Sequence, residues 1–575
     1  MSSSVSDAVK MSYHGALVGW ETRLLGFVQD NPTFPYYGCM DRGYWHYRAP
    51  SDFPSTMFQI GVLAMALGAV QARGTPRGAR FHELTRAALL FWSKTQHSDG
   101  THDEWYRHEH SYAATAFGAY AASEALLVLR DQHMQGSDEA PVVRAIERAA
   151  VWLANRRDEH VSNHTAGGIA ALQNAAVLTE RSDLSDAAVT ELRLLSRRQH
   201  AEGWLPEYDG FDPGYLTVSI GYLAAYRRRG GDALADHVIE RACSAATLGV
   251  NPDGSFGGPY GSRNTQFLMP HGLELIRDRI PAASWILEST LGTGYRQLVG
   301  PSTADDRYFT FFFLWSYLWA QAVHDRAADT ASAALPSDLP QLVDAGLVRQ
   351  SVGPWELAMN VRKGGSLMLF RRGSLASVEA GYAAALDEHA WATSQTLGAP
   401  LSSHIEDRDG TFTLRVSAAF ATARPKNPLD RLALPFGFYK ASVAHLGAAA
   451  YRVGDWIKFR QIRRRTSLPL VLERKVTLTD ARARVCDVIT NRGPAVNMAL
   501  VETGSATTMH NPSSRFTTES VIDSVPMGPS WTGRLEQGVR VARRLELTAA
   551  TDAVIDSGLN LLSSSTSAPP SDGLE

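Results

Sequence analysis

A helix is predicted to begin within Val161-Ser162-Asn163-His164-Thr165-Ala166-Gly167-Gly168-Ile169-Ala170-Ala171-Leu172, where an Asn-His pair opens a run of small and apolar residues. Two strong hydrogen-bonding side chains at a helix start are rarely both needed for packing. Asn163 and His164 are therefore the first candidates for a functional site. The helix that carries them belongs to a long helical region.

This region runs from Phe53 to about Asp325 and has apolar residues three and four positions apart. Its predicted helices are Met57–Gln71, Phe81–Gln96, Ser111–Asp131, Val142–Asn155, Ala166–Thr179, Asp183–Gln199, Leu216–Arg228, Leu234–Leu248, Asn264–Arg277, Ala283–Leu291 and Tyr308–Val323. Polar turns follow helix ends at 92–100, 152–157, 197–203 and 251–254. Their spacing of about fifty residues is the length of one antiparallel helix pair. Such pairs predict a closed (α/α) toroid over residues 53–325. A straight solenoid would need polar capping repeats, and none is clear.

The sequence changes character after the helical region. An Ala/Ser/Asp/Pro-rich segment predicts a linker over 326–351. Short alternating segments follow at Ser366–Arg371, Leu375–Glu379, Thr411–Val416, Trp456–Arg464, Leu470–Thr477, Arg482–Thr490 and Met498–Thr503. They predict an antiparallel β-sandwich over 352–548, so the fold class is α+β multidomain. Residues 1–52 are predicted to be an aromatic-rich segment packed on the toroid, and 549–575 a disordered tail.

Bulk composition excludes several classes of protein. The chain has 575 residues, a formal net charge of -3 and 44% hydrophobic residues, which is typical of a soluble globular protein without a basic field for nucleic acid. Cys39, Cys243 and Cys486 are too few and too scattered for a disulfide framework or a Cys-rich metal site. Met1 to Glu21 does not resemble a signal peptide, and no apolar run is long enough for a membrane span. We therefore expect a cytoplasmic protein.

Candidate polar residues gather after the predicted helix ends. They are Asp103 to His110, then Asn163 and His164, then Glu207 to Tyr215, and then Tyr260, Arg263 and Asn264. Equivalent ends of stacked helix pairs lie on one face, so we expect these groups to converge on one rim. His108 and His110 lie two positions apart, whereas helical metal ligands lie four apart. Neither a metal site nor a cofactor is therefore predicted.

A helical toroid followed by an antiparallel sandwich resembles the heparinase II/III-like and alginate/chondroitin-type polysaccharide lyases. The Asn163-His164 pair resembles the Asn and His near the start of a barrel helix in those enzymes, which have a catalytic Tyr further along. In this chain Tyr208 and Tyr215 lie 45 and 52 residues after Asn163. The chain departs from the family in lacking a His-Gly-His run in the early sandwich, where it has only the isolated His389 and His404. A structural zinc site and a base from the second domain are therefore not implied.

The resemblance implies β-elimination on a uronic-acid-containing oligosaccharide or polysaccharide. Asn163 would donate a hydrogen bond to the substrate carboxylate, with Arg263 as a nearby cation. His164 would be the base or a carboxylate partner, and Tyr208 or Tyr215 would be base and then acid. Arg263 is expected near a helix N-terminus, where a cation is disfavoured, and this suggests an anionic partner.

Further residues are predicted to contact the sugar because aromatic rings stack on sugar faces and cations attract carboxylates. They are Arg42, Trp45, His46, Arg48, Trp105, Glu109, His110, Tyr112, Trp204, Glu207, Tyr260 and Asn264. Each also has a structural explanation. Asn163 suits a helix N-cap, Glu109 suits a first helical turn, and the tyrosines suit a core.

Three other functions remain open. A toroid glycoside hydrolase would use paired carboxylates, with Asp103, Glu109, Glu207, Asp209 and Asp212 as candidates. A uronic-acid C5-epimerase would need the same proton abstraction without elimination. A non-catalytic carbohydrate-binding protein would keep the aromatic residues and show no turnover.

Overall fold

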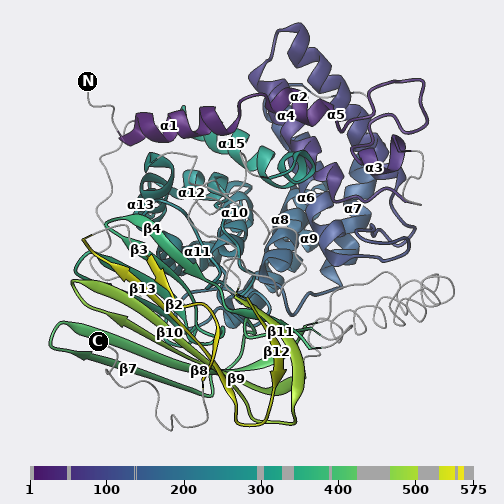
Figure 1. The fold of residues 1–575 in the computed structure, drawn as a ribbon. Coiled ribbons are helices and arrows are strands. Elements are labelled where there is room, and N and C mark those ends of the chain that lie inside the picture. The colour runs from purple at the N-terminus through teal and green to yellow at the C-terminus, as the bar shows by residue number, and fades with distance from the viewer. Residues whose placement is uncertain are drawn as a thin grey trace. The chain divides into compact units, whose positions relative to one another are not determined.

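A computed structural model describes residues 5–47, 53–134, 136, 139–293, 304–326, 342–386, 391–423, 466–502, 530–550 and 554–562. These residues form two compact units. The helical unit holds the described residues up to Phe256 and from Gln266 to Arg326. The sheet unit holds Gly257–Thr265 and the described residues from 342 onward. In Figure 1 the helices run from purple to teal and the strands from green to yellow.

Six inner helices of the helical unit form a closed ring. They are α4 (Val62–Gln71), α6 (Tyr112–Asp131), α8 (Ser162–Thr179), α10 (Pro213–Arg228), α12 (Pro270–Ile276) and α15 (Leu314–His324). Each packs against the next, and α15 packs against α4. The predicted toroid is therefore confirmed, and the solenoid is excluded.

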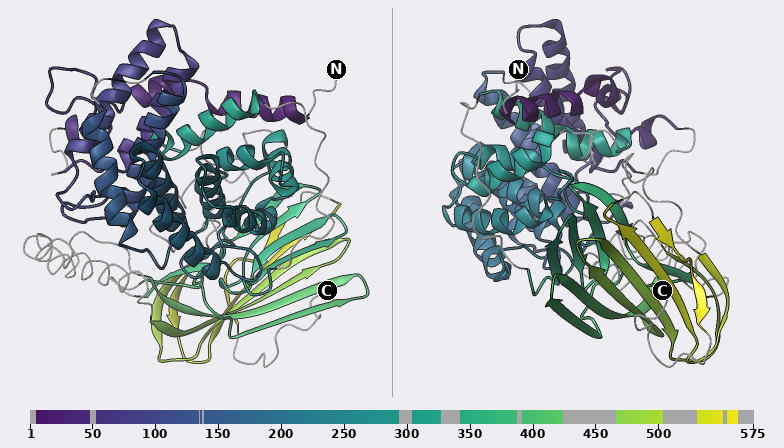
Figure 2. Two further views of the ribbon diagram at one scale, coloured as in Figure 1. Left: turned by 180° about the vertical axis from the view of Figure 1, so that it is seen from behind. Right: turned by 60° about the vertical axis from the view of Figure 1, so that its left-hand side comes forward.

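An outer layer of helices covers this ring. It consists of α5 (Pro76–Lys94), α7 (Ala140–Ala154), α9 (Ser182–Arg198), α11 (Leu234–Ala246), α13 (Pro281–Thr290) and α1 (Val5–Ala16), each packed on the next. The described part of the unit also contains short α-helices: α2 (Trp20–Leu25), α3 (Arg42–Trp45) and α14 (Asp306–Tyr308). Figure 2 shows these helices from two further sides.

Burial explains which helices are inner and which are outer. In α6 every residue from Tyr112 to Leu129 is buried, whereas α7 buries one face that includes Val142, Ile146 and Leu153. A helix that is apolar all round needs neighbours on every side, and an amphipathic helix needs them on one. By length and composition α6 could cross a membrane, but in this structure it is buried in the ring.

The polar turn after an outer helix recurs with the same hydrogen bonds. In its first copy the His97 N–H donates to the Thr101 carbonyl (2.9 Å) and the Gly100 N–H donates to the His97 carbonyl (3.0 Å). The turns at 200–204 and 251–255 repeat both bonds. The rhythm in the sequence therefore corresponds to a repeated structural unit.

A glutamine side chain fixes two of these turns to the next outer helix. Gln96 Nε2 donates to the carbonyls of Gly100 (3.0 Å) and Ala145 (2.8 Å). Gln199 Nε2 makes the equivalent bonds to Gly203 and Val238. Each turn is thereby held against the helix pair that follows it.

Gly203 should be the least replaceable residue of its turn. It has a φ of 92°, and an added Cβ would lie 2.4 Å from the Arg241 carbonyl oxygen. Gly230 has a similar φ of 83° with nothing within 4 Å. A left-handed backbone costs an L-residue about 1–2 kcal/mol, which sets the expected loss in Gly230→Ala. We expect Gly203→Ala to lose at least about twice as much free energy of unfolding, because the overlap adds to the same strain. Urea unfolding of both variants measures the difference, and equal losses would contradict the close approach.

Two antiparallel sheets form the core of the sheet unit. The first has the order β1 (Leu347–Val352), β2 (Trp355–Asn360), β3 (Ser366–Arg371) and β4 (Ser374–Glu379). The second has the order β12-β11-β5-β6-β8-β9-β10-β13-β14, with β15 paired to β13 and β7 paired to β8. Its strands are β5 (Tyr382–Ala385), β6 (Trp391–Thr393), β7 (Ser402–Arg408), β8 (Thr411–Ala423), β9 (Ser467–Leu478), β10 (Arg482–Asn491), β11 (Val496–Glu502), β12 (Ser530–Leu535), β13 (Arg540–Thr548), β14 (Val554–Asp556) and β15 (Asn560–Leu562).

Apolar side chains from both sheets share one core. Trp355 and Leu369 of the first sheet are buried together with Leu414, Val476 and Leu545 of the second. Such a shared layer defines a β-sandwich, as predicted. The strands can be followed from a second side in Figure 2.

Some predicted boundaries differ from the structure. β1 begins at Leu347, inside the 326–351 segment predicted as a linker. The sequence did not predict this strand because it is half-buried and carries few apolar residues. β14 and β15 form inside the predicted tail 549–575 by pairing with β13. The predicted strand Trp456–Arg464 lies outside the described residues.

A buried ion pair lies within the sandwich. Arg474 donates two hydrogen bonds to Asp487 (2.8 and 2.7 Å), and the two side chains are 0% and 2% exposed. The same guanidinium donates to the carbonyls of Gly365 and Glu379 (both 2.9 Å). The Tyr382 hydroxyl donates to Asp487 (2.7 Å). Both charges are thus hydrogen-bonded on several sides.

Candidate functional site

The start of α8 is capped by a carboxylate from a distant loop. The backbone N–H of Asn163 donates to Glu207 Oε1 (2.9 Å), and its Nδ2 donates to both Glu207 oxygens (2.9 and 2.8 Å). Both side chains are buried. An anion at a helix N-terminus satisfies an otherwise unpaired N–H and the positive end of the helix dipole. Asn163 is therefore not the N-cap, which is Val161.

The loop that carries Glu207 is bound along its length to the start of α8. Ser162 donates from its N–H and its hydroxyl to the Pro206 carbonyl (3.3 and 2.7 Å). The Tyr208 N–H donates to the His160 carbonyl (3.3 Å). Because this loop leads into α10, the starts of α8 and α10 lie at the same end of the ring.

Asn163→Leu should destabilise the fold. The predicted donor to a substrate carboxylate has its amide directed at Glu207, and removing it would leave that buried carboxylate short of hydrogen bonds. We expect a loss of about 3 kcal/mol in the free energy of unfolding. Asn155→Leu at the exposed C-cap of α7 is the control and should change stability by less than about 0.5 kcal/mol. Unchanged stability with lost turnover in Asn163→Leu would restore the predicted substrate role.

His164 is held by a buried carboxylate. Its Nδ1 lies 2.7 Å from Asp158 Oδ2, and the two side chains are 19% and 10% exposed. Burial raises the pKa of Asp158, but hydrogen bonds from His164 and from the backbone of His160 and Val161 outweigh it and hold this pKa below its usual range. The carboxylate therefore stays ionised and favours an N–H on Nδ1. This leaves Nε2 of His164 without a hydrogen bond to any described residue.

The two candidate tyrosines have different environments. Tyr208 is partly exposed and has a φ of 52°, which is uncommon for a bulky residue and costs energy. Tyr215 lies in the first turn of α10, is 6% exposed, and packs edge-on against Phe267 with a centroid distance of 5.5 Å. Of the two, Tyr208 is the more accessible, and its loop is bonded to the start of α8.

The start of α6 lies beside this end of α8. The Phe117 ring packs edge-on against His164 with a centroid distance of 5.4 Å. The Tyr112 hydroxyl packs against Gly168, where an added Cβ would lie 2.6 Å away. Tyr112, predicted to contact sugar, is therefore buried between two inner helices.

The loop before α6 contains three more predicted sugar contacts. Glu109 is buried, and its Oε2 accepts from the N–H groups of Glu104 (2.9 Å) and Trp105 (2.7 Å). His110 is buried against Asp99. Trp105 is 59% exposed and is the member of this group best placed to stack on a ligand.

Trp204, another predicted sugar contact, packs against residues of its own turn. Trp204 is buried, donates to Glu202 (2.8 Å) and stacks on His200. These contacts hold Trp204 within its own turn, and its predicted contact with sugar stays a prediction.

The N-terminal loop is partly described. Arg42 donates to the Gly26 carbonyl (3.3 Å) and Trp45 donates to the Phe27 carbonyl (3.0 Å). His46 is exposed beside Arg42. Arg48 lies outside the described residues.

Tyr260, Arg263 and Asn264 belong to the sheet unit. The Tyr260 hydroxyl accepts from Arg349 (3.0 Å), and Asn264 accepts from the Lys363 ammonium group. The predicted helix Asn264–Arg277 is wrong at its start, because α12 begins at Pro270. Arg263 thus lies in a turn, and the inference from a helix dipole does not apply to it.

The carboxylates proposed for a hydrolase are mostly occupied. Asp103 accepts from the N–H groups of His108 and His110, and Asp212 is the N-cap of α10. Glu109 and Glu207 make the bonds described above, and Asp209 is exposed. The buried candidates therefore have structural partners, which gives a paired-carboxylate mechanism little support.

No family model matches the chain, and no curated protein sequence matches it. Solved structures with a similar chain path include a chondroitin AC lyase of Streptomyces coelicolor A3 in complex with chondroitin sulphate (12% identity, 97% of this chain, 79% of that chain, TM-score 0.49). Another is the heparan sulfate lyase HepC of Pedobacter heparinus (10%, 95%, 82%, TM-score 0.41). A third is a GH127 β-L-arabinofuranosidase of Geobacillus stearothermophilus T6 (10%, 96%, 96%, TM-score 0.33). At these identities the likeness concerns the path of the chain and not the residues of a site.

Proposed function

We propose that this protein cleaves a uronic-acid-containing oligosaccharide or polysaccharide by β-elimination. The observation that carries the proposal is the His164–Asp158 pair at the end of the helical ring. One nitrogen of this imidazole is held by an ionised carboxylate, and the other is directed away from it. Such an imidazole is suited to act as a general base. Asp158 acts as a positioning residue.

The proposed reaction uses groups at one end of the ring. His164 Nε2 removes the proton from C5, and the electron pair of the C5–H bond forms the C4–C5 double bond. The C4–O bond breaks, and the Tyr208 hydroxyl donates a proton to the leaving oxygen. Proton exchange with solvent then restores both side chains. Asn163 and Glu207 position the loop that carries Tyr208.

The exposed ring of Trp105 supplies a stacking surface on the neighbouring loop. The strained backbone of Tyr208 supports the same assignment, because such strain persists where the surroundings hold it and clusters at functional sites.

Ultraviolet absorbance of the unsaturated uronate product tests the proposal. The protein is incubated with a panel of uronic-acid glycans and short oligosaccharides, and a time-dependent rise that is absent with heat-treated protein is expected. New reducing ends without absorbance would indicate a hydrolase. Exchange of the C5 proton in heavy water without either signal would indicate an epimerase. If none of the three signals appeared with any member of the panel, the remaining hypothesis would be a protein that binds carbohydrate without catalysis.

A further inference from the structure

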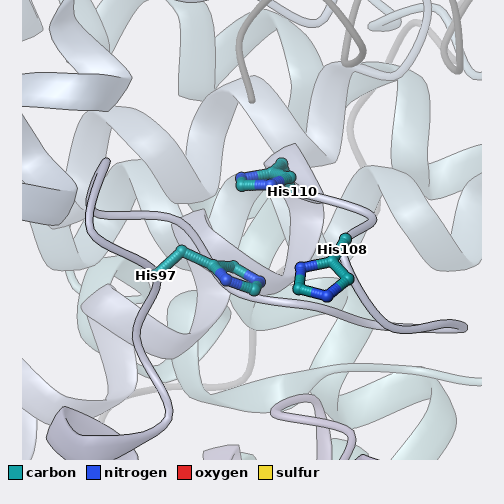
Figure 3. Close-up of side chains that lie close together, drawn as sticks. All are labelled: His97, His108 and His110. Atoms are coloured by element: carbon teal, nitrogen blue, oxygen red, sulfur yellow. The ribbon is translucent and has the colours of Figure 1, made fainter. Parts of the chain in front are cut away.

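Three histidines of the helical unit lie together, one in the turn after α5 and two in the loop before α6. His97, His108 and His110 each offer a nitrogen, and these nitrogens lie within 4.8 Å of one another. Figure 3 shows the three rings gathered from two segments of chain. The ring centroids of His97 lie 4.4 Å from His110 and 5.6 Å from His108.

Two carboxylates flank the cluster. Asp103 Oδ1 lies 2.9 Å from His97 Nε2, and Asp99 Oδ2 lies 2.9 Å from His110 Nδ1. Neither His97 Nε2 nor Asp99 Oδ2 has a well-directed hydrogen bond within the described part of the chain, although both are buried. Buried polar atoms of this kind are rare unless a further partner is present, and an ion is one such partner.

The backbone is shaped to bring the rings together. His108 and His110 both have positive φ values, 62° and 53°, and their N–H groups donate to the two oxygens of Asp103 (2.8 and 3.0 Å). The loop is closed by pairing of His102 with Ser111. Left-handed backbone at two nearby histidines costs energy that the Asp103 carboxylate offsets. The spacing of two residues excludes a shared helix face, but the nitrogens of both rings still lie within 4.8 Å of each other.

We propose that His97, His108 and His110 bind a divalent transition-metal ion of the zinc class. Imidazole nitrogens are preferred ligands of Zn²⁺, at about 2.0–2.1 Å, so small side-chain rotations close the remaining distance. Histidine ligands of metals commonly donate their second N–H to a carboxylate or another oxygen, and Thr101 Oγ1, at 2.6 Å from His110 Nδ1, is placed for this role with Asp99 beside it. Asp103 is placed as a further oxygen donor or as a partner of His97. This inference does not depend on the proposed function.

Zinc binding to the full chain, measured by equilibrium dialysis and by the visible spectrum of added Co²⁺, tests this site. About one equivalent per chain is expected for the unmodified protein, with loss in His97→Ala and in His108→Gln. Asp99→Asn should weaken binding by about 10–100-fold. The control is His200→Ala, because His200 occupies the equivalent turn, stacks on Trp204 and lies outside the cluster.

Circular dichroism of each variant establishes that it folds. No stoichiometric binding by the unmodified protein, or equal loss in His97→Ala and His200→Ala, would overturn the proposal. If His97→Ala does not fold, His108→Gln gives the same decision, because His108 lies on the loop and not at the repeated turn.

Discussion

His164→Gln should lower the rate of β-elimination by a factor of about 10²–10⁴, which is the usual contribution of a well-placed general base. Glutamine keeps much of the size and polarity of the side chain but cannot accept a proton near neutral pH. The free energy of unfolding should change much less than the activation free energy of the reaction, because His164 is partly exposed. Initial rates of absorbance increase on the best substrate of the panel measure the effect.

His237→Gln is the matched control, because His237 is exposed on the outer helix α11 and should leave the rate unchanged. Asp158→Asn tests the positioning role separately. It should lower the rate, because the imidazole of His164 loses the carboxylate that orients it. A full rate in His164→Gln would remove this residue from the chemistry.

Arg474→Met should lower the free energy of unfolding by about 3–5 kcal/mol, the usual cost of leaving one partner of a buried ion pair uncompensated. Asp487 would keep the Tyr382 hydroxyl but lose two hydrogen bonds from the guanidinium. The carbonyls of Gly365 and Glu379 would lose their donor as well. The change in the free energy of unfolding is measured by chemical denaturation, monitored with a signal that reports on the sheet unit.

Arg492→Met gives the comparison for a surface pair. Arg492 and Glu473 are 56% and 52% exposed, and their nearest charged atoms lie 3.5 Å apart. Exposed pairs contribute about 0–1 kcal/mol, so this variant should remain close to the unmodified protein. If both variants lost similar free energies of unfolding, burial would not be the reason that the Arg474–Asp487 pair stabilises the fold.

The sequence predicted most of the architecture because both periodicities were strong. The helical period and the recurring polar turns predicted the ring, and strict alternation of apolar and polar residues predicted strands such as β10. The predicted strands omitted β2 and β13, and also weaker strands in which burial is uneven. β1 is half-exposed along most of its length, and β14 is exposed and exists by pairing with β13.

The site was harder to predict, because its residues act through partners that are distant in sequence. Asn163 was expected to face substrate, but Glu207, 44 residues later, occupies its amide. The partner of His164, Asp158, lies six residues before it in a turn that periodicity does not describe. The grouping of His97 with His108 and His110 was not predicted, because the spacing rule applied to His108 and His110 holds only for helices. The shared Gln-His start of the turns at Gln96 and Gln199 was a readable signal of their common structure.

Closure of the ring has a consequence for the order in which the chain is made. The residues of α4 from Val62 to Ala69 are all buried, and one of the neighbours that cover them is α15. A ribosome produces α4 long before α15, so a nascent chain that ends before Leu314 exposes the part of the apolar α4 surface that α15 covers in the closed ring. Chaperones that hold apolar helices should therefore bind nascent chains shorter than this and release those in which α15 has emerged.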